Sequence, residues 1–471
     1  MNDFFLSLLL LGSLSSGPEA PFWSTAGCHG LAPESACGTL AVVGAGMDYD
    51  STKALQWHWK TSFGARMDEV SKELVPDQVY AGLRWKALDL DLGIKHRETL
   101  CTGADPLLGS LSVTGCSLVW SGNARSMPGY TLTLNPVDIP FTNGRLHLSG
   151  SWGDYLTTDQ RYVRDALVHN MRLGLGFDIS SRLRAVAALD LFGLWGGTNP
   201  DSGPNPSGFA NYLRMCTGRK GGADATQMDR ENTLGDLLGS ELLALEYKAD
   251  GWSLSLRHEI PFEDRSGMKF QNFPDGVNTL HLRMADRDAW VTDAVLEYHS
   301  TMSQSGTDER RPATEEEIEK DDPRLYFHEN GSVFTIVGGR DDYGNNFEYK
   351  TGWTYYGRSI GHPMFFPLGT KDGAWSRDGM TQGVENNRLR AVHMGLSGKL
   401  WHRIPYRMML TWSGNYGRYG VPFDRLDQFC TALQASIPLP GGFSILPGFY
   451  ADLGKYLPGN VGATLGIRYL L

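Results

Sequence analysis

Three segments of the sequence gather the side-chain types that bind sugars. Residues 120–128, 262–276 and 352–363 each place aromatic, amide, carboxylate or guanidinium groups within a few positions of one another. A sugar ring presents hydroxyls, which pair with Asn, Asp, Glu and Arg, and a flat face of C–H groups, which packs on Trp or Tyr. The polysaccharide-binding residues that we predict on this basis are Trp120, Asn123, Arg125, Glu263, Asp264, Asn272, Asp275, Trp353, Tyr355 and Arg358.

The same residues have a structural interpretation, which is the stronger one for any single position. An Arg125 paired with Glu263 or Asp264 would neutralise charges that a protein interior must satisfy. Glycines such as Gly276 and Gly352 would permit tight turns or close backbone contacts. In either role the three segments would line an interior cavity or its mouth.

Catalysis is not predicted. The sequence contains no H-E-x-x-H, G-x-S-x-G or Walker motif. Glu263 and Asp264 are adjacent, and adjacent strand residues point to opposite faces, so this pair would not straddle a glycosidic bond. We therefore expect a protein that is not an enzyme, with no catalytic residues and no cofactor.

The six cysteines show neither C-x-x-C spacing nor a nearby histidine pattern. No metal site is predicted, because zinc sites need such spacing. Outside the inner membrane the cysteines could pair as Cys28–Cys37 or as Cys101–Cys116, or they could stay unpaired.

Strict alternation of apolar and polar residues is the recurring pattern of the chain. In residues 55–63 the aromatic side chains of Trp57, Trp59 and Phe63 alternate with polar neighbours, and the last segment, 461–471, repeats the pattern. Period-2 alternation indicates strands with two different faces. Many such segments reach about 10 residues, the length of a transmembrane strand, whereas strands of soluble sandwiches are usually about 5–6 residues long.

These segments predict an all-β fold, a transmembrane antiparallel β-barrel of about 16–18 strands. A closed barrel leaves no unpaired strand edge in lipid, so outer-membrane lipid is an expected partner and the outer membrane the expected location. The formal net charge of -10 is spread along the chain without a basic stripe, which argues against nucleic acid as a partner. We expect the polar motif segments to fill the lumen.

The connections between strands fall into two lengths, as the two ends of such a barrel require. Short turns such as 249–251 contain Gly and Asp, whereas residues 196–234 and 300–330 are long. Residues 303–324 are nearly devoid of apolar side chains and predict a mobile surface loop. Residues 232–240 carry leucines at helical spacing and suggest one short helix.

The N-terminal stretch has two interpretations. Residues 4–11 are apolar and short enough for the core of a signal peptide, but no basic residue precedes them. We therefore divide the chain into residues 1–20, either a signal peptide or the start of the first strand, and residues 21–471, the barrel.

Four motifs in order resemble the Bacteroidota branch of the Wzi capsule-assembly family. They are Pro-Phe-Trp at 21–23, W-S-G-N-A-R at 120–125, the F-E-D…S-G-M…N…D-G segment at 262–276, and G-W-T-Y-Y-G-R-S-I-G-H-P at 352–363. The resemblance covers almost the whole chain. It implies an outer-membrane lectin that binds capsular polysaccharide or exopolysaccharide and helps attach the capsule, with the capsule export machinery as a further partner.

Two other classes of protein are consistent with the pattern. A barrel of this size can also be a porin-like diffusion channel, in which inward charges such as Lys60, Arg172 and Arg257 would set ion preference. A soluble secreted β-protein would show similar alternation. Single-channel conductance would favour the channel, and solubility without detergent would favour the secreted protein.

Overall fold

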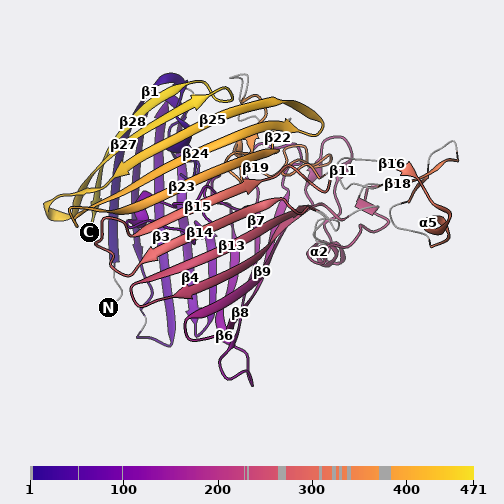
Figure 1. The fold of residues 1–471 in the computed structure, drawn as a ribbon, viewed down its shortest axis with the longest axis horizontal. Coiled ribbons are helices and arrows are strands. Elements are labelled where there is room, and N and C mark those ends of the chain that lie inside the picture. The colour runs from indigo at the N-terminus through magenta and orange to yellow at the C-terminus, as the bar shows by residue number, and fades with distance from the viewer. Residues whose placement is uncertain are drawn as a thin grey trace.

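The computed structural model shows one closed wall of antiparallel strands (Figure 1). The structure describes residues 4–50, 52–69, 71–97, 99–226, 229–230, 233–263, 272–306, 310–320, 325–327, 331–336, 341–370 and 383–471. Eighteen strands form the barrel, and β1 (Phe4–Glu19) pairs with both β2 (Ser35–Met47) and β28 (Asn460–Leu470) to close it. The predicted antiparallel β-barrel is confirmed.

The other wall strands are β3 (Leu55–Asp68), β4 (Lys72–Trp85), β5 (Leu88–Ile94), β6 (Pro128–Asp138), β7 (Leu146–Leu156), β8 (Leu167–Asp178), β9 (Leu183–Trp195), β12 (Asp236–Lys248), β13 (Trp252–Glu263), β14 (Gly276–Met284), β15 (Asp293–Ser300), β23 (Leu389–Leu400), β24 (Ile404–Arg418), β25 (Val421–Ala435) and β27 (Phe443–Gly454). The short strands are β10 (Thr198–Asn199), β11 (Gly203–Pro204), β16 (Arg310–Pro312), β17 (Leu325–Phe327), β18 (Val333–Ile336), β19 (Thr354–Tyr355), β20 (Arg358–Ser359), β21 (Phe366–Pro367), β22 (Val384–Asn386) and β26 (Ile437–Pro438). The helices given for the described residues are α1 (Phe22–Thr25), η1 (Pro106–Leu108), α2 (Phe209–Cys216), α5 (Glu315–Glu319) and η2 (Pro440–Gly442). Among the described residues, no helix is long and apolar enough to cross a lipid bilayer.

The two faces of the wall follow the alternation in the sequence. In β3 the outward side chains of Trp57 and Phe63 are 50% and 44% exposed, whereas the inward side chains of His58 and Ser62 are 6% and 2% exposed. The outward row is apolar because it meets lipid, and the inward row is polar because it meets the lumen.

The two ends of the barrel differ. Both termini and short turns such as 249–251 lie at one end, at the left in Figure 1, and long connections such as 196–235 and 301–388 extend from the other. Outer-membrane barrels place short turns in the periplasm and long loops outside the cell. We therefore call the first end periplasmic and the second extracellular.

Long connections fill much of the lumen. The segments that we call the plug are residues 20–34, 95–127 and 341–370. They bond to inward groups on several strands: the Leu118 N–H donates to Glu259 of β13 at 3.0 Å, and Trp23 Nε1 donates to Thr411 Oγ1 of β24 at 3.1 Å. The prediction of lumen-filling loops is confirmed.

A disulfide closes one turn of the plug. Cys101 and Cys116 are bonded, with their Cα atoms 6.1 Å apart, so one of the two pairings open from the sequence is present. Cys28 and Cys37 are free thiols.

Two local predictions from the sequence are wrong. Leu237 and Leu238 belong to β12 rather than to a helix, because the strand pairs with β9 and β13 along its length. The segment expected to lack structure contributes β16 and the capped helix α5, and β16 pairs with β18 in a small three-stranded sheet. In Figure 1 this sheet projects beyond the extracellular end.

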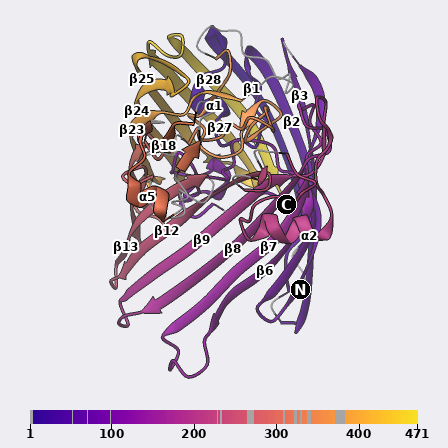
Figure 2. The same cartoon turned by 90° about the vertical axis from the view of Figure 1, so that its right-hand side faces the viewer.

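Helix α2 packs on the outside of the wall near the extracellular rim (Figure 2). Its Tyr212 hydroxyl accepts a hydrogen bond from Trp152 Nε1 of β7 at 3.0 Å and donates one to Asp154 at 3.0 Å. In β8 the buried His169 shares the outward face with the exposed Leu173. The helix therefore covers the polar outward groups Asp154 and His169. Facing lipid, these groups would have no hydrogen-bond partners.

Candidate functional site

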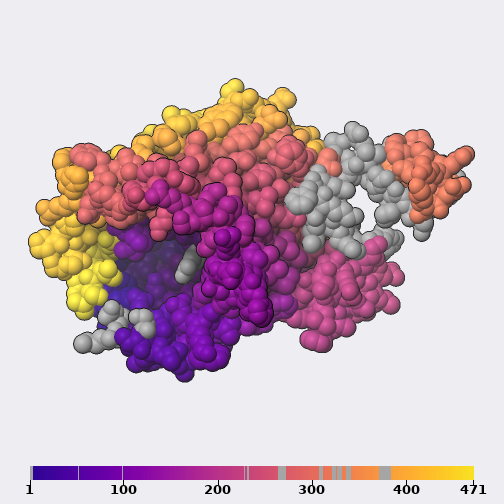
Figure 3. Space-filling model, turned by 60° about the horizontal axis from the view of Figure 1, so that its bottom comes forward, coloured from indigo at the N-terminus to yellow at the C-terminus, as the bar shows by residue number. Residues whose placement is uncertain are grey.

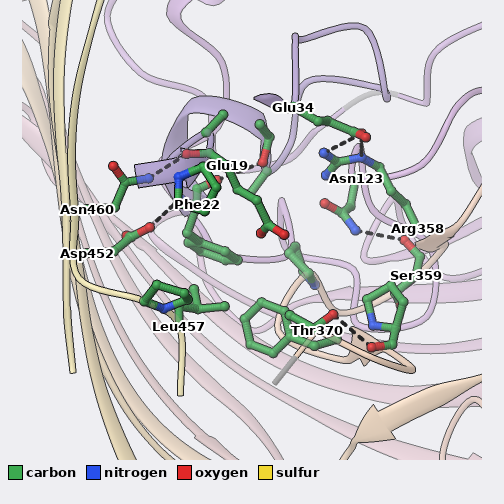
Figure 4. A pocket seen from close by; sticks show the side chains of 18 residues that line it. Glu19, Phe22, Glu34, Asn123, Arg358, Ser359, Thr370, Asp452, Leu457 and Asn460 are labelled. Carbon is green, nitrogen blue, oxygen red and sulfur yellow. Dashed lines mark hydrogen bonds and ion pairs between the residues drawn. The ribbon is translucent and has the colours of Figure 1, made fainter. Parts of the chain in front are cut away.

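A pocket lies between the plug and the wall toward the extracellular end (Figure 4). Its volume is about 770 Å³, including space open to solvent. The end of β1, helix α1, the plug and the hairpin of β27 and β28 all contribute to it. The lining includes Glu19, Phe22, Glu34, Asn123, Arg358 and Asp452. Three of the four sequence motifs thus meet here, through Phe22, Asn123 and Arg358.

The two predicted site residues that line this pocket are held in place by plug contacts. Asn123 Nδ2 donates to the Ser359 carbonyl at 3.0 Å, and Arg358 Nε donates to Glu34 Oε1 at 2.8 Å. Because these contacts fix the Asn123 amide and the Arg358 guanidinium group, both groups are already in position when a ligand arrives.

Glu19 is the most available acceptor in the pocket. Its side chain points toward the centre of the lining residues (Figure 4). Within the described part of the chain, no group is hydrogen-bonded to its carboxylate, although Asn460 Nδ2 donates to its backbone carbonyl at 2.6 Å. The aromatic rings of Phe22 and Phe366, whose centroids are 5.8 Å apart, supply an apolar surface nearby.

A chain of alternating charges ties the plug to the wall beside the pocket. Arg358 pairs with Glu34 at 2.8 Å, and the same carboxylate lies 3.8 Å from Arg66 of β3. Arg66 also pairs with Glu73 of β4, which accepts from Arg125 at 2.7 Å. Arg125 therefore neutralises a wall carboxylate on β4 rather than Glu263, and the alternative pairing with Asp264 lies outside the described residues.

The predicted aromatic residues form the core of the plug. Trp120, Trp353 and Tyr355 are all buried, and the rings of Trp120 and Trp353 meet edge to face at 6.3 Å. Trp353 Nε1 donates to the Val119 carbonyl at 2.6 Å, and the hydroxyls of Tyr355 and Thr158 share a hydrogen bond of 2.6 Å. These contacts match the structural interpretation and place the three residues behind the pocket rather than on its surface.

The predicted residues Asn272 and Asp275 of the 262–276 motif hold other loops in place. Asp275 accepts from the backbone N–H groups of Ser303 and Gln304 at 2.8 and 2.7 Å. The buried Asn272 donates to the Pro261 carbonyl at 2.9 Å. None of these contacts lies in the pocket.

Glu263 and Trp353 line a smaller pocket between the plug and the wall strands β12 and β13, of about 340 Å³ including space open to solvent. The Gly344 N–H donates to Glu263 at 2.6 Å. A close backbone contact explains the glycine that begins the 352–363 motif, because a Cβ on Gly352 would lie 2.1 Å from the Gly344 carbonyl oxygen and φ there is +65°. The remaining predicted residue, Asp264, lies outside the described residues.

Sequence reasoning missed the acceptors that the wall supplies. Glu19 ends β1 two residues before the first motif, and Asp452 lies in β27 near the other end of the chain. Asp452 Oδ2 accepts from the Phe22 N–H at 2.8 Å and so positions helix α1. The one sequence feature that could have identified Glu19 is its closeness to the Pro-Phe-Trp motif at 21–23. No sequence feature identified Asp452.

A pH-dependent contact lies in the long connection between β9 and β12. Asp229 is buried, and its Oδ1 accepts from the Gly235 N–H at 3.1 Å. Burial, together with the neighbouring Glu348 carboxylate, raises the pKa of Asp229 to about 7.

The folded loop therefore favours the protonated acid. Its stabilising contribution is complete below the unfolded pKa of about 4 and is lost as the pH rises toward the folded value. We expect the hydrogen-exchange protection of the Gly235 amide to fall between about pH 4 and 7. Asp229→Asn should remove that fall, and an equal fall in the variant would contradict the assignment.

The closed wall, the lipid-facing belt and the filled lumen define an outer-membrane β-barrel, and the outer membrane is where this protein resides. No family model matches the sequence, and no curated protein matches it. Among solved structures the chain is similar to Wzi of Escherichia coli, described as an outer membrane protein involved in group 1 capsule assembly and a carbohydrate-binding β-barrel. That match has a TM-score of 0.57 and 13% identity and covers 99% of this chain and 84% of Wzi.

Porins align over the same length with lower scores. OpdL of Pseudomonas aeruginosa has a TM-score of 0.46 and 10% identity, covering 100% of this chain and 98% of its own. OprD of the same organism has a TM-score of 0.44 and 11% identity, covering 100% and 95%. At these identities the likeness shows the fold alone, which is a Wzi-like outer-membrane barrel.

Proposed function

We propose that this protein binds a capsular or other surface polysaccharide at the outer membrane and helps to hold it on the cell. The pocket beside the plug carries this proposal, because it combines an unengaged carboxylate, fixed polar groups and aromatic rings. The carbohydrate binding described for Wzi, which shares the fold, supports it. The role is one of binding rather than catalysis.

The pocket suits a sugar unit on chemical grounds. The Glu19 carboxylate would accept hydroxyl hydrogen bonds, which are stronger to a charged acceptor than to a neutral one. The ring of Phe22 would pack against the C–H face of the sugar. The capsule export machinery would deliver the chain, and the barrel would hold it where the extracellular loops meet the wall.

The cellular experiment compares polysaccharide on the cells with polysaccharide shed into the medium, before and after deletion of the gene. We expect synthesis to continue and material to move from the cells to the medium. Complementation with the Glu19→Gln variant should leave the defect, whereas complementation with Glu315→Gln, an exposed carboxylate on α5, should repair it. Unchanged distribution together with reduced uptake of small solutes would overturn the proposal in favour of a porin-like diffusion channel.

A further inference from the structure

The periplasmic end of the lumen contains a second large cavity. It has a volume of about 1530 Å³, including space open to solvent, and it lies between Leu100 of the plug and the turn at Ser180. The space-filling view shows the barrel hollowed toward this end (Figure 3). We call this cavity the vestibule.

The vestibule is basic although the chain as a whole is acidic. The formal net charge of the protein is -10, yet the charged side chains that line the vestibule include two carboxylates, Asp178 and Glu246, against a larger set of cations. The cations are Arg145, Arg182, Arg184, Lys248, Arg257 and Arg283. The excess of positive charge is therefore local to this cavity.

Half of these cations have a carboxylate within ion-pair distance. Arg184 lies 3.8 Å from Asp178, Arg283 lies 3.0 Å from Asp293, and Arg182 lies 3.4 Å from Asp250. For the other half, which comprises Arg145, Lys248 and Arg257, the described residues provide no such partner within 4.0 Å.

Arg257 has the most constrained position of the three. It lies on the inward face of β13, and its direct cross-strand neighbours are Ala244 of β12 and Thr279 of β14. Neither neighbour carries a charge, and the Glu246 and Glu259 carboxylates, which attract the partly buried guanidinium group electrostatically, form no ion pair with it within 4.0 Å. Removing a charge from water without pairing it is unfavourable, and a bound anion would offset that cost.

Hydroxyl groups surround this position. On β13, Ser253 and Ser255 share the inward face with Arg257, and Ser255 pairs across the ladder with His281. The cations that line the vestibule come from several strands and turns, an arrangement that suits an extended ligand with several acidic groups better than one small anion. Short turns face the periplasm, so the ligand would enter from that side.

We propose that the vestibule binds a carboxylate-bearing saccharide, such as a run of uronate residues, through Arg257, Lys248 and Arg145. That the ligand is a saccharide rests on the proposed function, whereas its negative charge is inferred from the three cations that have no carboxylate within 4.0 Å among the described residues. The site is distinct from the pocket at Glu19, which lies toward the other end of the lumen and is lined by acidic groups.

The test is calorimetric titration of the purified barrel in detergent with trigalacturonate, with neutral maltotriose and with inorganic phosphate. We expect trigalacturonate to bind, to weaken as salt is added, and to lose at least tenfold in affinity in the Arg257→Gln variant. The matched control is Arg425→Gln, which changes an exposed arginine of β25 that pairs with Asp427 and should leave the affinity unchanged. Maltotriose should not bind at Arg257.

The alternative outcomes separate the parts of the inference. Trigalacturonate binding that is absent, or equal in the wild type and Arg257→Gln, would overturn the site. Phosphate binding as tightly as trigalacturonate would overturn the saccharide assignment and leave a general anion site. If cells retain their polysaccharide without this protein while trigalacturonate still binds through Arg257, the proposed function fails and the vestibule site stands.

Discussion

Replacing Glu34 by alanine is expected to release the plug from the wall. Glu34 pairs with Arg358 of the plug and lies 3.8 Å from Arg66 of β3, whose side chain is completely buried. Removing one partner of a buried ion pair costs about 3–5 kcal/mol when the remaining charge is left uncompensated, but Glu73 still pairs with Arg66 in the variant. We therefore expect a loss of about 1–3 kcal/mol, the cost of leaving buried donors without their acceptor, and a rise of about tenfold in the population with a displaced plug.

Conductance measures this directly. In planar bilayers we expect the wild type to be closed most of the time and Glu34→Ala to show frequent openings, with faster hydrogen exchange in residues 20–34. Glu315→Ala removes an exposed carboxylate of α5 and serves as the control. A Glu34→Ala barrel as silent as the wild type would show that other contacts hold the plug.

Replacing Glu19 by glutamine is expected to weaken polysaccharide binding without disturbing the fold. The Glu19 side chain takes part in no hydrogen bond or ion pair with the described residues, so the isosteric amide costs no native contact. Hydrogen bonds to charged groups contribute about 1.5–3 kcal/mol, which corresponds to a loss of affinity of about tenfold or more.

Titration of wild type and variant with fragments of the host's own surface polysaccharide provides the measurement. Glu315→Gln changes the same residue type at an exposed position and should bind like the wild type. Equal affinity of Glu19→Gln and wild type would place the sugar elsewhere on the barrel.

The strands of the barrel wall could be predicted from the sequence because each strand shows its two faces in the alternation of neighbouring residues. Alternating residues such as those around Trp57 face lipid and lumen in turn, and a period of two shows this without any tertiary contact. The same local pattern gives the wrong prediction at Leu237 and Leu238, whose spacing fits a helix although, as adjacent residues of β12, they lie on opposite faces of the strand. Strand pairing with β9 and β13 decided that segment, and pairing across the barrel is not visible in a local pattern.

The described part of residues 303–324, which comprises 303–306 and 310–320, also differs from the prediction for a physical reason. Few apolar side chains are available there, yet the Thr314 hydroxyl and the Glu317 carboxylate form a capping box that starts α5. The strand β16 then pairs with β18 through backbone bonds, which do not depend on apolar residues.

The candidate site could be predicted in part. Motif chemistry identified Asn123 and Arg358, which line the pocket, but it did not identify their partners. The contact between Arg125 and Glu73 joins residues far apart in sequence, and Glu19 reaches the pocket because the end of β1 lies beside the plug. Such contacts depend on how the plug sits in the barrel.

Retention of the purified barrel on the immobilised surface polysaccharide of its own host tests the central claim most directly. Heat-modifiable migration on a gel would first establish that the barrel is folded. We predict saturable retention that soluble polysaccharide competes away and that the Glu19→Gln variant loses. A folded barrel that is not retained, or a Glu19→Gln variant retained as well as the wild type, would contradict polysaccharide binding in this pocket.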